Sequence, residues 1–423
     1  MITRIMVAGG GTGGHLFPGL AVIEELRRRV PDLQVRFVGT ARGIEARVLP
    51  DRGEALDLLE VRPLKGQGVG ARLSSMARIP SAMTEASRLI RDFAPDLVLG
   101  VGGYASGPVL LAASLRGVPT AVLEQNAHVG MTNRILARFV DRAYVTFDTT
   151  VDVFGEQKSR LTGNPVRREF VELARRALAD PEGFEARAQT ILVLGGSQGA
   201  RKLNEELPKA FASAGLADRR MRVVHQTGAS MRDDVEATYR ALGIDAEVVT
   251  FIDDVARAFA NASLVVARAG ATTLAELCAI GRPSVLIPFP FAADDHQAKN
   301  AEALAERGAA ICVREADFAV ESVGGLVATL LDDPERRRTM SEAARAHGRP
   351  DAAATIVDDM VGWLGGPLAP DIDSVPPASE PPSGGSRGFE AAPIFRLGYS
   401  DIALRTRSVR PRRPVVVDGA VWE

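Results

Sequence analysis

Two glycine-rich turns stand about half a chain apart, and each follows a short apolar strand and opens a helix. The first lies in residues 5–20 (IMVAGGGTGGHLFPGL) and the second in residues 191–203 (ILVLGGSQGARKL). Glycines let backbone N–H groups converge, and the helix N-terminus adds partial positive charge. Each turn therefore predicts a site for phosphate or another anion, and the pair predicts two Rossmann-like halves facing a cleft.

Short apolar runs recur in both halves and alternate with helical patterns, which is typical of buried parallel strands. They are residues 5–8, 35–38, 97–100, 120–123 and 143–146 in the first half, and 191–194, 221–225, 247–250, 264–267 and 284–287 in the second. A chain of 423 residues has room for two domains of about 150 to 200 residues. We therefore expect an α/β fold with two Rossmann-like domains.

The boundary between the halves is predicted at residues 163–165 (Gly-Asn-Pro), whose residue types interrupt regular structure. This predicts an N-terminal domain over 1–163 and a C-terminal domain over 164–349, with a helix at about 350–364 that packs back on the first domain. Residues 372–387 are rich in Pro, Ser and Gly. Such a composition buries too little apolar surface to offset chain entropy, so 366–423 are expected to be a disordered tail.

Composition excludes several classes of protein. The formal net charge of -2 argues against a general nucleic-acid binder. Cys278 and Cys312 have no ligand spacing and are expected to be reduced thiols. The N-terminal apolar run is too short for a signal peptide, and no apolar stretch reaches the roughly 18 residues of a spanning helix. The sequence therefore predicts a cytoplasmic protein.

The first turn matches the GxGxxG pattern of dinucleotide-binding enzymes. An NAD site expects an acidic residue at the end of the second strand, but residues 35–38 run into Gly39-Thr40. Arg42 could serve a 2′-phosphate instead, so an NADP-dependent oxidoreductase remains an alternative. The second turn lacks the Gly-Lys-Ser/Thr that a P-loop requires, because residues 200–202 are Ala-Arg-Lys.

Nine motifs occur in one order along about residues 5–364. They are GGGTGGHLFPGLA (9–21), GVGGYASGP (100–108), LEQNAHVGMTNRILA (123–137), TGNPVR (162–167), LGGSQGARKLN (194–204), HQTG (225–228), FIDD (251–254), RAGATTLAEL (268–277) and DHQAKNA (295–301). In this order they resemble the MurG family of peptidoglycan N-acetylglucosaminyltransferases. The resemblance implies the GT-B architecture and the inverting transfer of N-acetylglucosamine (GlcNAc) from UDP-GlcNAc to the undecaprenyl-diphosphate-linked muramoyl pentapeptide, which converts lipid I to lipid II.

The resemblance also implies a substrate-binding set. It places Thr12, Gly13 and Gly14 at the first loop and Asn126 at the donor sugar, and it assigns donor contacts to Arg167, Ser197, Ile252, Ala271, Thr272, Thr273, Leu274, Ala275, Glu276 and Gln297. Residues 197–199 open a helix, whose N–H groups could hold the UDP diphosphate without a metal. Glu276 could accept both ribose hydroxyls, or be a solvated helix carboxylate. Arg167 could instead form a salt bridge at the hinge.

An inverting transfer needs a base near the acceptor hydroxyl. His15 follows the first glycine loop, and its ordinary pKa of about 6.5 suits this work. A helix N-terminus would lower that pKa and keep the ring neutral. The alternative is that His15 only hydrogen-bonds the acceptor or caps the loop. Tyr104 and Glu124 are the other candidates for acceptor binding. The Asp253-Asp254 and Asp294-Asp295 pairs are typical of loop and helix starts, so we expect no metal and no cofactor.

The implied acceptor carries a polyprenyl tail, which predicts peripheral attachment to the cytoplasmic face of the inner membrane. Residues 64–93 offer an anchor, with Leu73, Met76, Ile79, Pro80 and Met83 at roughly helical spacing beside Lys65, Arg72 and Arg78. The same spacing describes a helix packed on its own domain. The cluster Arg405, Arg407, Arg410, Arg412 and Arg413 could also bind anionic lipid. Expected partners are UDP-GlcNAc, the lipid acceptor, an anionic membrane surface and other cell-wall synthesis proteins.

Three other functions remain alternatives at this point. One is a glycolipid synthase of the same fold with a diacylglycerol acceptor, and another is the NADP-dependent oxidoreductase. The third is a binding scaffold without catalytic activity. The second loop together with residues 268–276 argues against the oxidoreductase, and the presence of His15, Asn126 and Gln297 argues against an idle scaffold.

Overall fold

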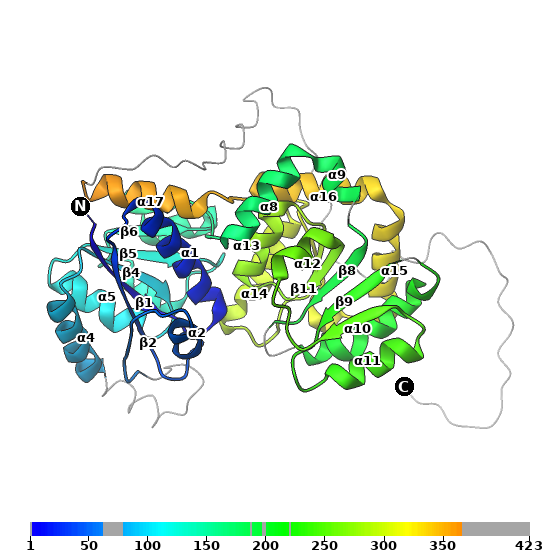
Figure 1. The fold of residues 1–423 in the computed structure, drawn as a ribbon, viewed down its shortest axis with the longest axis horizontal. Coiled ribbons are helices and arrows are strands. Elements are labelled where there is room, and N and C mark those ends of the chain that lie inside the picture. The colour runs from blue at the N-terminus through cyan, green and yellow to red at the C-terminus, as the bar shows by residue number, and fades with distance from the viewer. Residues whose placement is uncertain (1, 62–78, 187, 197–199, 220, 366–423) are drawn as a thin grey trace, which may run out of the picture. The chain divides into compact units, whose positions relative to one another are not determined.

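The computed structural model describes residues 2–61, 79–186, 188–196, 200–219 and 221–365, which form two parallel sheets with helices on their faces (Figure 1). Three of the predictions above lie wholly or partly outside the described residues: Ser197, the tail over 366–423, and the anchor, of which residues 64–78 are not described. The expected α/β class is confirmed. The domain boundary near residue 163 stays a prediction.

The first sheet has seven strands in the order β3-β2-β1-β4-β5-β6-β7, all paired in parallel. Their bounds are β1 Arg4–Gly9, β2 Gln34–Gly39, β3 Leu56–Leu58, β4 Leu97–Gly102, β5 Thr120–Glu124, β6 Arg142–Val145 and β7 Ser159–Leu161. The helices that precede or connect them are α1 Gly13–Arg29, α2 Glu45–Asp51, α4 Ile79–Phe93, α5 Ser106–Leu115, α6 Met131–Leu136 and α7 Val151–Phe154.

The second sheet has six parallel strands in the order β10-β9-β8-β11-β12-β13. Their bounds are β8 Thr190–Leu194, β9 Arg222–Gln226, β10 Ala246–Val249, β11 Ala262–Ala267, β12 Ser284–Leu286 and β13 Ile311–Cys312. The helices of this part of the chain are α8 Arg168–Ala179, α9 Pro181–Ala186, α10 Arg201–Ser213, α11 Arg232–Ala241, α12 Val255–Asn261, α13 Ala271–Ile280, α14 His296–Ala305, α15 Val320–Asp332, α16 Pro334–His347 and α17 Ala352–Trp363.

Both sheets follow the same strand order, because β8, β9, β10 and β11 repeat the arrangement of β1, β2, β3 and β4. The order reverses between β1 and β4 in the first sheet and between β8 and β11 in the second. Ligands of open α/β sheets bind outside the carboxyl ends of the strands at such a reversal. The two glycine-rich turns follow β1 and β8, so each stands at the reversal of its own sheet.

The continuous apolar runs are explained by burial on both faces of each sheet. In β1, Ile5 and Val7 belong to one core cluster, while Met6 and Ala8 belong to another. In β8 the residues at 191 and 193 likewise face one cluster, and those at 192 and 194 face the other. When the side chains on both faces of a strand are buried, the strand has no polar face. Its sequence then does not alternate between apolar and polar residues.

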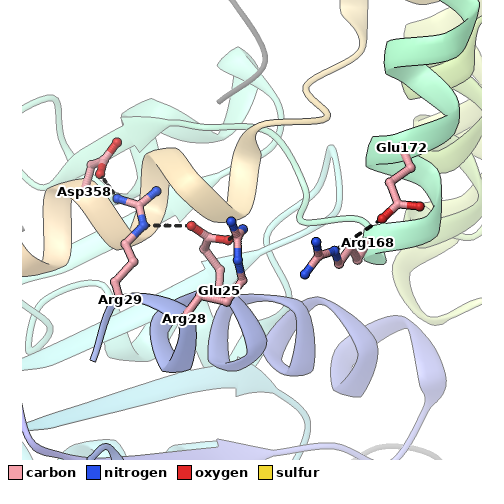
Figure 2. A network of polar contacts seen from close by, with 6 residues as sticks. All are labelled: Glu25, Arg28, Arg29, Arg168, Glu172 and Asp358. Atoms are coloured by element: carbon pink, nitrogen blue, oxygen red, sulfur yellow. Dashed lines mark hydrogen bonds and ion pairs between the residues drawn. The ribbon is translucent and has the colours of Figure 1, made fainter. Parts of the chain in front are cut away.

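Helix α17 follows the second sheet in sequence but packs on the first. Ile356, Val357 and Met360 are fully buried in the same core cluster as residues of α1. Figure 2 shows Arg29 of α1 between Glu25 of the same helix and Asp358 of α17. The Nε of Arg29 donates to Glu25 Oε1 over 2.7 Å, and Nη1 donates to Asp358. Apolar burial and a charged network therefore both hold α17 against α1.

Candidate active site

The first glycine turn is folded tightly against the end of β4. Gly9, Gly10 and Gly11 have φ values of 132°, 134° and 85°, a region that residues with a Cβ rarely adopt. A Cβ on Gly9 would lie only 2.0 Å from the carbonyl oxygen of Gly102. The Gly10 N–H donates to that same oxygen over 3.0 Å. Glycine is therefore required here both by the backbone conformation and by the close approach of the neighbouring turn.

His15 lies in the first turn of α1 with its ring against this glycine loop. Its Nδ1 is 3.1 Å from the Gly10 carbonyl oxygen and 3.4 Å from Thr12 Oγ1. A carbonyl oxygen only accepts, so we infer that Nδ1 carries the proton of the neutral ring and that Nε2 has the free lone pair. A Cβ on Gly102 would lie 3.1 Å from Nε2, so this nitrogen faces the turn after β4.

Burial lowers the pKa of His15 below its usual 6.5. The Gly10 carbonyl and the charge of Glu45 act in the opposite direction, while the charge of His296 lowers the pKa further. From the sequence we also expect a lowered pKa for His15, but with the helix N-terminus as the cause. The largest cause in the structure is burial. A neutral imidazole at pH 7 with a free Nε2 can accept a proton.

Glu45 is a site residue that sequence reasoning missed. It begins α2, and only 1% of its surface is exposed. Its Oε2 accepts from the Gly11 N–H over 2.6 Å, and its Oε1 accepts from the N–H and the hydroxyl of Thr40 over 2.9 and 3.0 Å. One N–H of the first turn thus already binds a carboxylate of the chain itself. The expectation of an open anion site at this turn is wrong at Gly11.

The loop after β5 holds two predicted residues, Glu124 and Asn126, in one network. Glu124 is buried, and burial raises the pKa of its carboxyl group. Its Oε1 accepts from the Asn126 N–H over 3.1 Å, and its Oε2 accepts from Asn133 Nδ2 over 3.0 Å. Both oxygens of Glu124 are therefore engaged within the chain, and Asn126 is held by one of them. Tyr104, the other candidate for acceptor binding, is 46% exposed.

Asn126 also contacts α14 through Asn300, a second residue that the sequence interpretation did not single out. Asn300 Nδ2 donates to Asn126 Oδ1 over 3.1 Å, and Asn300 Oδ1 accepts from the Ala127 N–H over 2.8 Å. Asn300 is fully buried. Asn300 therefore fixes both the side chain of Asn126 and the backbone that follows it.

Residues 271–276 form the first turns of α13, directly after β11. Ala271, Leu274 and Glu276 are buried, while Thr272, Thr273 and Ala275 are partly exposed. Leu274 belongs to a hydrophobic core cluster and Ala275 packs against it, so their side chains serve packing. The Thr272 hydroxyl lies 3.5 Å from the carbonyl oxygen of Gly14, next to Gly13 in α1. Among this group, Glu276 is the one ionisable side chain.

Glu276 and Arg167 form an ion pair with each other. Arg167 Nε and Nη2 both donate to Glu276 Oε1, over 2.9 and 2.7 Å. Burial raises the pKa of Glu276 to about 7, although Arg167 acts to lower it. The two residues predicted to contact the donor are thus brought together. A solvated helix carboxylate, the bland alternative for Glu276, is wrong, because only 3% of the residue is exposed.

Gln226 links the second glycine turn to Ile252, and sequence reasoning missed it too. Its Nε2 donates to the Gly196 carbonyl over 3.0 Å, and its Oε1 accepts from the Ile252 N–H over 3.3 Å. In the same half, Gln297 Oε1 accepts from the Phe289 N–H over 3.0 Å.

Within the described part of the chain, no cluster of three or more His, Cys, Asp or Glu residues has the geometry to hold a metal ion.

Comparison with known proteins places this chain in a family. Residues 5–145 match the glycosyltransferase family 28 N-terminal domain, and residues 190–356 match its C-terminal domain. The chain is 47% identical over 355 residues to the UDP-N-acetylglucosamine–N-acetylmuramyl-(pentapeptide) pyrophosphoryl-undecaprenol N-acetylglucosamine transferase of Anaeromyxobacter dehalogenans, covering 84% of this chain and 91% of the relative. Against the protein of that name from Myxococcus xanthus it is 45% identical, covering 85% and 93%.

A solved structure agrees with these sequence matches. The crystal structure of Acinetobacter baumannii MurG superposes with a TM-score of 0.68 at 32% identity, covering 84% of this chain and 98% of that one. The expected GT-B-like architecture is therefore confirmed. The chain belongs to glycosyltransferase family 28 and, within it, to the MurG family of UDP-GlcNAc-dependent N-acetylglucosaminyltransferases.

Proposed function

We propose that the chain transfers GlcNAc by a single inverting displacement in which His15 removes the proton of the acceptor hydroxyl. As a member of the MurG family, its substrates are UDP-GlcNAc and undecaprenyl-linked lipid I, and its product is lipid II. The observation that carries the proposal is the orientation of His15, whose Nδ1 faces the Gly10 carbonyl and leaves Nε2 as a base. General-base catalysis of this kind contributes about 10² to 10⁴ in rate.

We assign the donor to the residues around α13 and the second glycine turn. The ion pair of Arg167 with Glu276 Oε1 supports this, because it orients a carboxylate that can receive the ribose hydroxyls. Gln297 Oε1 accepts from the Phe289 N–H, so its Nε2 is the group that we assign as donor to the sugar hydroxyls. Ile252 offers its backbone carbonyl to the uracil, since its N–H donates to Gln226 Oε1. We expect residues 197–199, which lie outside the described part of the chain, to bind the leaving diphosphate.

The proposal is tested by transfer of labelled GlcNAc from UDP-GlcNAc to a short-chain lipid-linked muramoyl peptide. We expect product formation to continue in EDTA, because backbone N–H groups and the helix dipole stabilise the departing UDP. A parallel reaction with diacylglycerol as acceptor is expected to give no product. Activity that disappears in EDTA and returns with magnesium or manganese would overturn the metal-free mechanism.

Membrane attachment at the cytoplasmic face belongs to the same proposal, since the acceptor of the family is lipid-linked. Among the described residues, no helix is long and apolar enough to cross a membrane. In the predicted anchor, Leu73 and Met76 lie outside the described residues, Pro80 is exposed and Met83 packs partly buried against its own core. The apolar face of α4 therefore largely covers its own domain, which is the alternative reading of that spacing.

An exposed apolar stripe on α6 and the turn after it offers a better anchor. Met131, Ile135 and Phe139 are 52%, 59% and 42% exposed, and we call them the α6 stripe. Arg134 and Arg138 between them are exposed as well. Apolar side chains that enter the lipid interface and arginines that attract anionic headgroups are the two components of peripheral binding. The α6 stripe thus supplies both components in a segment of nine residues.

Changing Ile135 and Phe139 to Ser is expected to lower binding to anionic vesicles by about tenfold or more, because each side chain loses its insertion into lipid. Sedimentation with phosphatidylglycerol vesicles measures this, and Leu178→Ser, an exposed leucine on α8, is the matched control. A chain ending at Gly365 is expected to bind as the full chain does. Binding that is lost only on this truncation would move the anchor to the arginines at 405–413.

A further inference from the structure

Three glycines make room for the side chain of Glu45. A Cβ on Gly10, Gly39 or Gly43 would lie 2.4, 2.5 or 2.0 Å from an atom of the Glu45 side chain. These glycines come from the first glycine turn, from the end of β2 and from the segment before α2. The carboxylate therefore occupies a close-fitting cradle in which no larger residue could stand at any of the three positions.

Within this cradle, hydrogen bonds to both oxygens fix the orientation of the Glu45 carboxylate. Oε2 accepts from the Gly11 N–H over 2.6 Å, and Oε1 accepts from the Thr40 N–H and hydroxyl over 2.9 and 3.0 Å. Charge-assisted hydrogen bonds of this kind are about twice as strong as neutral ones. Gly11 lies beside Gly10, and the Gly10 carbonyl oxygen faces the His15 ring. By fixing the backbone at Gly11, Glu45 therefore also fixes the carbonyl group that orients His15.

We propose that Glu45 is a positioning residue for His15: its carboxylate fixes the first glycine turn, against which the His15 ring lies, and brings a negative charge to that turn. The proposal rests on the role of His15 as the base. Nothing in the chemistry requires Glu45 to touch a substrate. Its oxygens are engaged by the Gly11 N–H and by Thr40, so its effect reaches the reaction through the Gly10–Gly11 backbone and through its charge.

Two charged groups act on the His15 ring from the elements around it. Glu45 of α2 raises its pKa, whereas His296 at the start of α14 lowers it. The Gly10 carbonyl raises the pKa by accepting the Nδ1 proton, and burial lowers it. Removing the charge of Glu45 therefore leaves burial and His296 less opposed, and the pKa of His15 must fall.

The test replaces Glu45 by glutamine, which keeps the volume but turns an N–H₂ group or a neutral oxygen to the Gly11 N–H. The pKa of His15 is measured by NMR in the full chain with ¹³C-labelled histidine, and the signal is assigned among five histidines from the His15→Gln spectrum. We expect this pKa to fall by about 0.5 to 1 unit. The acidic limb of the kcat profile should move to lower pH by the same amount, since the base must be neutral to act.

At pH 8 we expect Glu45→Gln to lower kcat about tenfold, because the base is weaker and its turn is displaced, with the KM for UDP-GlcNAc unchanged. Glu25→Gln is the matched control. Glu25 is a buried glutamate on the same helix as His15, ten residues or about 15 Å along it. This control variant is expected to keep both the wild-type pKa of His15 and the wild-type kcat.

A pKa of His15 in Glu45→Gln equal to that of the wild type and of Glu25→Gln would overturn the proposal. So would a rise in the KM for UDP-GlcNAc with kcat and pKa unchanged, because Glu45 would then serve donor binding. If Glu45→Gln does not fold, Glu45→Asp is tested instead, because its side chain is one methylene shorter and withdraws the carboxylate from the glycine turn. An unchanged pKa of His15 in this variant also overturns the proposal. If His15→Gln keeps its kcat, the role of His15 as the base fails, while the NMR comparison still decides the role of Glu45.

Discussion

Replacing His15 by glutamine is expected to lower kcat by about two to four orders of magnitude while leaving the affinity for UDP-GlcNAc unchanged. A glutamine amide can still donate to the Gly10 carbonyl, so the glycine turn keeps its contact. It has no nitrogen that can accept a proton, so the function of Nε2 is lost. Steady-state kinetics with varied acceptor, combined with calorimetry of donor binding, measures the two effects separately.

The alternative for His15 is that it only positions the acceptor. A loss confined to the acceptor KM, with kcat preserved, would support that role and contradict general-base catalysis. His347→Gln is the matched control, because this exposed histidine at the end of α16 lies outside the proposed site. It is expected to keep both kinetic constants at their wild-type values.

The core strands could be predicted from sequence because they are buried on both faces. A run such as residues 5–8 is apolar at every position, and β1 forms there. The strands that were missed are β3, β7 and β13, which have two or three residues and lie at sheet edges. A strand so short is specified by pairing with its neighbour rather than by its own residues, so no pattern within it predicts it.

The site residues that were missed share one physical reason. Glu45 reads as an ordinary acidic residue at the start of a helix, and its importance comes from Gly11, 34 positions earlier. Asn300 acts on Asn126 across 174 positions. Such partners are set by tertiary structure, which a local pattern does not contain. One signal was present in the sequence: Gly39 and Gly43 stand six and two positions before Glu45, and both leave room for its side chain.

Arg167 and Glu276 are predicted as site residues from the sequence, but their contact with each other is not. Each could be singled out as a donor contact through the resemblance, and the hinge salt bridge was kept as the alternative for Arg167. The structure is consistent with both roles, the donor contact and the salt bridge, because the ion-pair partner of Arg167 is Glu276, 109 positions away. An ion pair inside a binding site can serve both purposes, since the cation orients the carboxylate for its ligand.

Glu276→Ala is expected to weaken UDP-GlcNAc binding by about 1.5 to 3 kcal/mol, or roughly 10- to 150-fold, because it removes a charged acceptor of the ribose hydroxyls. It also leaves the Arg167 guanidinium without its partner. Calorimetry on the purified variant measures the affinity, and circular dichroism verifies the fold. Glu182→Gln, an exposed carboxylate on α9, is the matched control. An unchanged affinity in a folded Glu276→Ala chain would contradict the donor assignment.

The same residue predicts how donor affinity depends on pH. Burial raises the pKa of Glu276 to about 7, so the carboxyl group gains a proton as the pH falls through neutrality. The protonated group accepts hydrogen bonds less well and loses its attraction to Arg167, so donor affinity is expected to fall between pH 8 and pH 6. The phosphates of UDP-GlcNAc are diesters and do not titrate in this range. Glu276→Gln, which cannot ionise, is therefore expected to bind equally weakly at both pH values, and a wild-type pH dependence in that variant would assign the titration to another group.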